Sequence, residues 1–198
     1  MPKQIFKVFS IFAIVLMASN AQARIAFSGG TLYYGSIVAE GELKGVGGNN
    51  DHRLLTTVPA MYILGECVNS QGNNDGGVVG AAFVVNLGAV VDDVEDPTTK
   101  NGKTPVSTTH ELPDPNDPIA IAEFFPDACD KTAGAAGFTL AGYSIVSFDV
   151  IMQAQTCATY DDVDGSCLDW ETVDKLEFLG CDGPAGEPGD PILGCNED

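Results

Sequence analysis

The chain contains few positive charges. Its 198 residues include nine Lys and Arg against 28 Asp and Glu, which gives a formal net charge of −19 at pH 7. Nucleic acids and anionic membranes carry the same sign of charge, so an acidic surface repels both. We therefore expect neither as a partner, whereas a protein or glycan partner, or a cation, is compatible with this charge.

The short motifs of common hydrolases and metal sites are also missing. The sequence has no GxSxG, HExxH or CxxC, and its two histidines, His52 and His110, are far apart. Ser107, His110 and Glu111 supply the residue types of a serine triad, but three neighbours on one stretch of chain do not preorganise it. We expect no enzymatic activity. A secreted hydrolase with paired carboxylates is an alternative that the number of acids cannot test.

Long hydrophobic runs are absent except at the N-terminus. There, a basic start is followed by the apolar segment Val8–Ala18, which is too short to span a bilayer comfortably, and by Ala21-Gln22-Ala23. This order predicts a signal peptide over residues 1–23, with a membrane anchor as the alternative. Cleavage would leave seven cations and 28 acids, a net charge of −21, on a secreted or periplasmic chain without a membrane anchor.

The six cysteines all lie in the predicted mature part. An even number in an exported chain predicts a disulfide framework, for which six cysteines allow 15 connectivities. Proximity in the sequence favours two local pairs and one long-range pair: Cys157–Cys167, Cys181–Cys195 and Cys67–Cys129.

The longest regular pattern in the chain is Phe138–Ala154, where apolar side chains alternate with a period of two and Gly142 interrupts the alternation. This predicts a long strand with a kink or bulge, or two strands that meet at a corner. Leu168–Leu179 has the composition of a strand that returns beside it, and Arg24–Val46 that of one or two strands.

The remaining segments are less regular. We predict a hairpin over Arg53–Val68, with Pro59 at its bend or at an edge, and a doubly buried strand over Val78–Val91, with a helix as the alternative. The proline-rich stretch Asp92–Pro118 predicts a long loop in which only Val106–Leu112 pairs, as a short edge strand. Ile119–Phe125 fits a strand or one helical turn.

Together these segments predict an all-β protein, a single antiparallel β-sandwich with long loops, for which an immunoglobulin-like arrangement is one form. The domain would cover residues 24–180. Residues 181–198 would form an acidic, Gly- and Pro-rich tail pinned by its own disulfide.

One sequence resemblance accompanies this pattern. The segments 41–47 (GELKGVG), 67–73 (CVNSQGN) and 138–150 (FTLAGYSIVSFDV), with Cys129 between the last two, resemble a pattern in small uncharacterised bacterial secreted proteins. The resemblance covers about half of the chain. It implies no activity and supports the pairing of Cys67 with Cys129.

The strongest chemical candidate is an acidic loop that follows the central strand. With Gly165 at the sixth position of a calcium loop, Asp162, Asp164 and Glu171 occupy the third, fifth and twelfth positions, but Tyr160 stands where the motif needs Asp. The loop is therefore not an EF-hand. A different wrap around calcium would draw on the carboxylates of the whole loop, and the alternative is a solvated acidic loop. The candidate ligands are Asp161, Asp162, Asp164, Asp169 and Glu171.

These observations predict an exported binding or surface-structural protein, with calcium as the one cofactor to consider. An alternative from another class is a subunit of an extracellular fibre or adhesive assembly, joined by strand addition at an exposed sheet edge.

Overall fold

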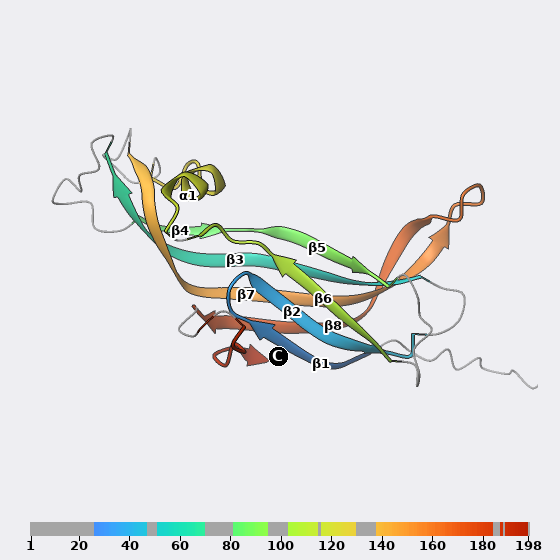
Figure 1. The fold of residues 1–198 in the computed structure, drawn as a ribbon. Coiled ribbons are helices and arrows are strands. Elements are labelled where there is room, and N and C mark those ends of the chain that lie inside the picture. The colour runs from blue at the N-terminus through green and yellow to red at the C-terminus, as the bar shows by residue number, and fades with distance from the viewer. Residues whose placement is uncertain are drawn as a thin grey trace, which may run out of the picture.

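The computed structural model describes residues 26–46, 51–69, 81–94, 103–114, 116–129, 138–183, 187 and 189–197. The fold is an elongated sandwich of two antiparallel sheets, with one short helix at one end (Figure 1). The elements are, in chain order, β1 (Ala26–Tyr33), β2 (Ile37–Lys44), β3 (His52–Val68), β4 (Ala81–Val85), β5 (Gly88–Asp93), β6 (Lys103–His110), α1 (Pro118–Phe124), β7 (Thr139–Tyr160), β8 (Cys167–Asp182) and β9 (Asn196–Glu197). The all-β fold class predicted from the sequence is confirmed.

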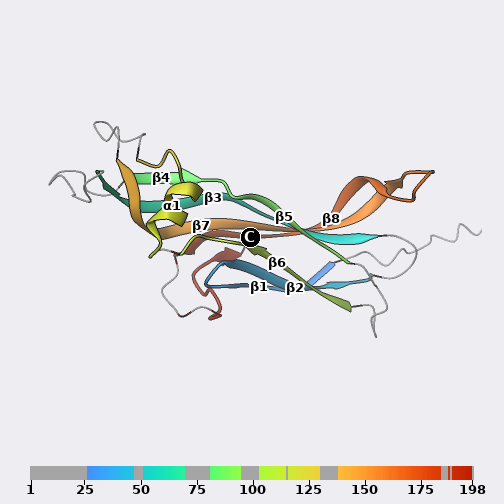
Figure 2. The same ribbon diagram turned by 45° about the horizontal axis from the view of Figure 1, so that its top comes forward.

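The two sheets differ in size. Sheet A has three strands in the order β1-β2-β6, and sheet B has six, in the order β4-β3-β7-β8-β9, with β5 also paired to β3. Figure 2 shows sheet A as a short layer across the middle of the longer sheet B. Both ends of β3 and β7 therefore extend beyond the second layer.

The core lies between the sheets and consists of every second residue of the central strands. The fully buried side chains include Leu54, Val58 and Met61 of β3 and Phe148, Val150 and Met152 of β7, and sheet A contributes Leu32, Ile37, Leu43 and Val106. Close packing of the layers requires a small residue on β1, because a Cβ on Gly30 would lie 2.9 Å from the Leu176 side chain.

The predicted hairpin over Arg53–Val68 is wrong, because this segment is one continuous strand of 17 residues. Its alternation was assigned correctly, since Met61 and Ile63 are buried while Tyr62 and Leu64 are exposed. Pro59 lies at a register shift between β3 and β7, where a missing N–H removes no ladder bond. A bulge therefore accommodates the proline that the sequence placed at a bend.

The predicted doubly buried strand over Val78–Val91 is also wrong. Within the described residues the segment forms two strands, β4 and β5, that pair one after the other with the same edge of β3. Asn86 and Leu87 separate them, and Gly88, at φ +75°, begins β5. The side chains alternate between partial burial and exposure because an edge strand here is covered on one face only.

The predicted central strand is confirmed and is longer than expected, since β7 runs for 22 residues. Register shifts against β3 fall between Leu140 and Gly142 and between Ile145 and Ser147, so the predicted irregularity near Gly142 is present. Val146 departs from the buried alternation: it lies at the second shift and is about half exposed.

The stretch predicted as a loop contains one strand, as expected, although β6 begins earlier than the predicted edge strand and ends at His110. Pro105 lies within it, at the free edge of sheet A. Of the two forms considered for Ile119–Phe125, the helix is the correct one. Asp117 caps α1 by accepting hydrogen bonds from the N–H groups of Ile119 and Ala120, and Pro118 occupies the first turn.

All three predicted disulfides are present: Cys67–Cys129, Cys157–Cys167 and Cys181–Cys195. Three disulfides are typical of an oxidising environment outside the cytoplasm. The described part of the C-terminal tail packs on the sandwich, where Ile192 is buried and donates its N–H to the Leu32 carbonyl, 2.7 Å away.

The predicted signal peptide, residues 1–23, lies outside the described residues. No helix in the described part of the chain has the length and hydrophobicity that a membrane crossing needs.

Candidate functional site

The acidic loop predicted to bind calcium forms the tip of a hairpin between β7 and β8. This hairpin extends past the rest of the sandwich (Figure 1). The turn closes with a hydrogen bond from the Asp161 N–H to the Ser166 carbonyl, 2.7 Å, and with Gly165 at φ +74°. The sequence therefore identified a turn that requires glycine at this position.

Two of the predicted calcium ligands already serve the turn. Asp161 Oδ1 accepts the Val163 N–H at 2.7 Å, and Asp164 Oδ1 accepts the Ser166 N–H at 2.9 Å. The bond from the Ser166 backbone, followed by that from its hydroxyl, lowers the pKa of Asp164. Asp162 is exposed at the tip.

The other two predicted ligands, Asp169 and Glu171, lie further along on β8, opposite Thr159 and Thr156. In the described part of the chain, no three His, Cys, Asp or Glu side chains are close enough together to share a metal ion. The five predicted ligands are thus on one hairpin but are not gathered around one point, and calcium binding stays a prediction.

The residues considered for a serine triad are not brought together either. His110 points into the sandwich, where its Nε2 lies 3.2 Å from the Thr56 carbonyl. Ser107 lies on the opposite, exposed face of β6, and Glu111 accepts a hydrogen bond from Ser36 at 2.6 Å. The three side chains therefore form no relay in this structure.

Both histidines are buried. Burial lowers the pKa of His110, and a hydrogen bond to the Thr56 carbonyl opposes that effect. Burial also lowers the pKa of His52, against the opposing charge of Asp51. Within the described chain, neither ring nitrogen of His52 has a hydrogen-bond partner, and its cross-strand neighbour Thr156 has an unpaired hydroxyl.

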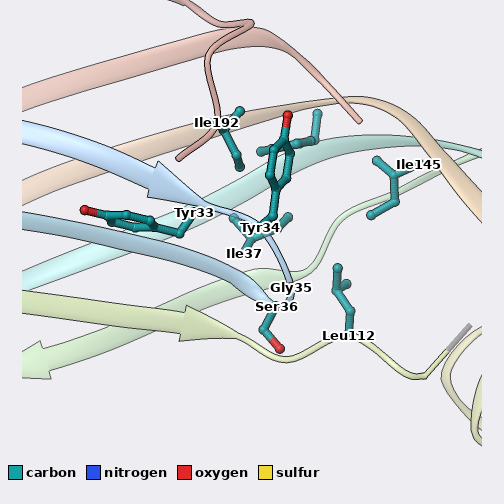
Figure 3. Close-up of a pocket in the computed structure, with 9 residues that line it drawn as sticks. Tyr33, Tyr34, Gly35, Ser36, Ile37, Leu112, Ile145 and Ile192 are labelled. Atoms are coloured by element: carbon teal, nitrogen blue, oxygen red, sulfur yellow. The ribbon is translucent and has the colours of Figure 1, made fainter. Parts of the chain in front are cut away.

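The small pocket in Figure 3 lies where the β1–β2 turn meets Leu112 and Ile145. Its volume of about 10 Å³ is that of one water molecule. A larger open groove of about 470 Å³ adjoins it, lined by Leu112, Pro113, Asp114 and Tyr143. The Tyr143 hydroxyl donates to the Pro113 carbonyl at 2.7 Å, so its polar end is already occupied.

The outer faces of the two sheets contrast in chemistry. The outer face of sheet A is polar, with Glu40, Glu42 and Lys103 on neighbouring strands and an ion pair of 2.9 Å between the last two. Lys103, followed by Ser28, lowers the pKa of Glu42. This face offers charged side chains to solvent.

The outer face of sheet B has an apolar part. Tyr62 pairs with Val84 and Leu64 with Ala82 across β3 and β4, and Val91 pairs with Leu55 across β3 and β5. Four large apolar side chains of this set are 40–54% exposed: Tyr62, Leu64, Val84 and Val91. We refer to these four residues as the apolar face. Tyr62, Leu64 and Val84 lie together, whereas Val91 lies seven residues along β3, opposite Leu55. Exposed apolar surface of this kind is typical of an interaction site.

Sequence reasoning did not identify the apolar face. The alternation over Met61–Glu66 was visible, but it does not tell which of two apolar sets lies inside. Tyr62 and Leu64 could have been recognised as a second apolar set on the outer face, had the partner strand been known.

Comparison of the chain with known protein families, with curated proteins and with solved structures finds no match. Function must therefore be argued from the chain's own surfaces.

Proposed function

We propose that the protein is an exported, non-enzymatic module that acts as a binding or surface-structural unit. The observation that carries this proposal is the placement of the three disulfides on a long sandwich. Cys67–Cys129 ties the helix end, Cys157–Cys167 joins the strands of the projecting hairpin, and Cys181–Cys195 holds the C-terminal tail. Each bond thus ties a part at the periphery of the sandwich to a strand of sheet B.

Such an arrangement suits a protein that has to stay folded outside the cell. The N-terminal basic and apolar segment supports export, and oxidising conditions outside the cytoplasm let disulfides form and persist. A net charge of −19 favours solubility and disfavours contact with anionic surfaces. The described functional groups suit recognition through surfaces better than chemistry in a closed site, because the groove beside Tyr143 is open and the hydroxyl of this tyrosine is already bonded.

The proposal is tested by fractionating cells that produce the full chain and alkylating the cysteines before lysis. We expect a product without residues 1–23 outside the cytoplasm, with all six cysteines protected from alkylation until a reductant is added. A reduced protein in the cytoplasm would contradict export. Turnover of any member of a broad panel of glycans and esters by the purified protein would contradict the non-enzymatic part and favour the hydrolase alternative.

A further inference from the structure

The described strands leave four sheet edges, and three of them are protected. On β6, the Ser107 N–H donates to the Asp92 carboxylate at 2.8 Å, and Pro105 has no N–H to offer. Such devices keep the free backbone groups of an edge from pairing with another chain.

The edges of β1 and β8 are covered in part by other segments of the chain. On β1, the Phe27 N–H donates to the Asp174 carboxylate at 2.8 Å, and Tyr33 forms a bridge with Pro191 of the tail. On β8, the strand β9 pairs with Phe178 and Leu179 only, and the rest of the strand carries charged side chains, which disfavour pairing with another chain.

The fourth edge is formed by β4 and β5 in turn, and its β4 part has no such protection. The β4 residues Ala81–Val85 pair with β3 on one side only, and in the described structure no hydrogen bond covers the other side. In an antiparallel ladder, every second residue of an edge strand points its N–H and C=O away from its neighbour. These groups form a template that fits an extended strand.

The absence of charged residues around β4 indicates which strand can pair with it. Charged residues make up 19% of the chain, yet none occurs in the 16 residues Gly76–Val91 that contain β4. Tyr62 and Leu64, which flank β4 on the outer face, are also uncharged. Two copies of a chain with a net charge of −19 repel each other wherever their carboxylates meet, and β4 itself carries none. The exposed Glu66 lies on β3, beyond the end of its pairing with β4.

We propose that β4 pairs with β4 of a second copy of this chain, antiparallel and about a two-fold axis near Phe83. The arrangement is self-complementary, since Ala82 of one copy lies opposite Val84 of the other. It joins two six-stranded sheets into one and aligns the apolar faces of the copies across the new seam. This inference deepens the surface-structural role proposed above and rests on it.

The contact is short, because β4 has five residues. We therefore expect reversible association with a dissociation constant on the order of 10–100 µM, as for a small interface. Sedimentation velocity of the oxidised mature protein from low to high micromolar concentration measures it, and the expected result is a monomer–dimer equilibrium.

Two matched variants test the location. Val84→Glu adds a carboxylate at the edge, on a side chain that is 54% exposed, and should weaken dimerisation about tenfold or more because it places like charges across the seam. Val163→Glu makes the same change at the hairpin tip, where the side chain is 94% exposed, and should leave dimerisation unchanged. Far-UV circular dichroism checks that both variants are folded.

Amide hydrogen exchange adds a second measure. If the edges pair, exchange within Ala81–Val85 should slow as the protein concentration rises. A chain that stays monomeric at every concentration, an equal loss of dimer in both variants, or a dimer without added protection in β4 would each overturn the proposal. A monomer that is exported and fully oxidised would leave the proposed function standing.

Discussion

The two ends of the long β3–β7 pair extend beyond sheet A, and they are stabilised in different ways. At one end, α1 takes the place of the second layer (Figure 1). Ile121 is fully buried there, and the Phe125 ring lies 5.6 Å from that of Phe83 and 5.3 Å from that of Tyr143. At the other end, the β7–β8 hairpin has no covering layer in the described structure and depends on its turn, on Cys157–Cys167 and on local pairs.

The difference indicates which contacts make the unfolding of this domain cooperative. The helix end is held by a segment far away in the sequence, so its packing is part of the common core. The hairpin end is held mainly by bonds between neighbours in the sequence, such as Cys157–Cys167. A long-range contact supports only its base, where the Arg53 guanidinium of β3 lies 4.1 Å from the Trp170 ring centroid of β8. A change at the helix end should therefore destabilise the whole domain, and a change at the hairpin should act locally.

The largest effect is expected from removal of the aromatic anchor of the helix end. Phe125→Ala should lower the free energy of unfolding by about 3–5 kcal/mol, the usual loss for a buried phenylalanine. Chemical denaturation measures it. Phe124→Ala is the matched control, because this ring is 41% exposed and should cost about 1 kcal/mol or less. Equal losses in the two variants would mean that α1 does not act as a covering layer.

The disulfides at the two ends provide the next comparison. Cys67–Cys129 closes a loop with a sequence separation of 62, whereas Cys157–Cys167 closes one of 10. In the chain-entropy account, replacing the first pair by alanine should cost about 4 kcal/mol and replacing the second about 3 kcal/mol.

Thermal and denaturant unfolding of the two double variants measures this difference. If the loss of Cys157–Cys167 lowered the free energy of unfolding more than the loss of Cys67–Cys129, the hairpin end would have to be part of the cooperative core.

A smaller, pH-dependent effect is expected from His52. This residue begins β3 and pairs with Thr156 of β7, at the base of the β7–β8 hairpin. Its folded-state pKa is lowered by burial, so above about pH 6.5, the ordinary value, it is neutral in both states and contributes no pH dependence. As the pH falls below that value, the unfolded chain binds a proton that the folded chain does not, and stability is lost.

His52→Leu should therefore reduce the loss of stability between pH 7 and pH 5, as measured by urea denaturation. The carboxylates are the same in both proteins, so their titration cancels in the comparison. His110→Leu is a second test, because burial also lowers the pKa of His110, and this variant too should lose less stability between pH 7 and pH 5. Parallel pH profiles for wild type and His52→Leu would contradict the assignment.

The sequence predicted those parts of the fold that local patterns determine. The alternation of β7 was visible because one face of that strand is buried along most of its length, and nearness in the sequence was enough to pair Cys157 with Cys167. The features that the sequence did not predict depend on which strands pair with one another. The bulge that lets Pro59 remain inside one strand exists only against β7, so no local signal distinguishes it from a hairpin bend.

The same limit applies to the candidate surfaces. Val78–Val91 has the composition of a buried strand, yet the part that forms β4 and β5 lies at an edge, because its position is set by pairing with β3. The apolar face and the unprotected edge follow from that position and could not be predicted from composition. The acidic turn could be predicted, since Gly165 and its flanking aspartates are turn formers in any context.

The smallest expected effect concerns calcium at the hairpin end. Because the predicted ligands are spread along the hairpin, binding would require the turn to give up bonds such as that of Asp164 to Ser166, and the affinity should resemble that of weak extracellular sites. With calcium at its dissociation constant, the stabilisation is only about 0.4 kcal/mol. Thermal unfolding should show a small rise of the midpoint with calcium and none with magnesium, and the rise should vanish in Asp162→Asn/Asp164→Asn. An unchanged midpoint at tens of millimolar calcium would mean that these carboxylates serve the turn alone, and that the hairpin end depends on its disulfide and strand pairing.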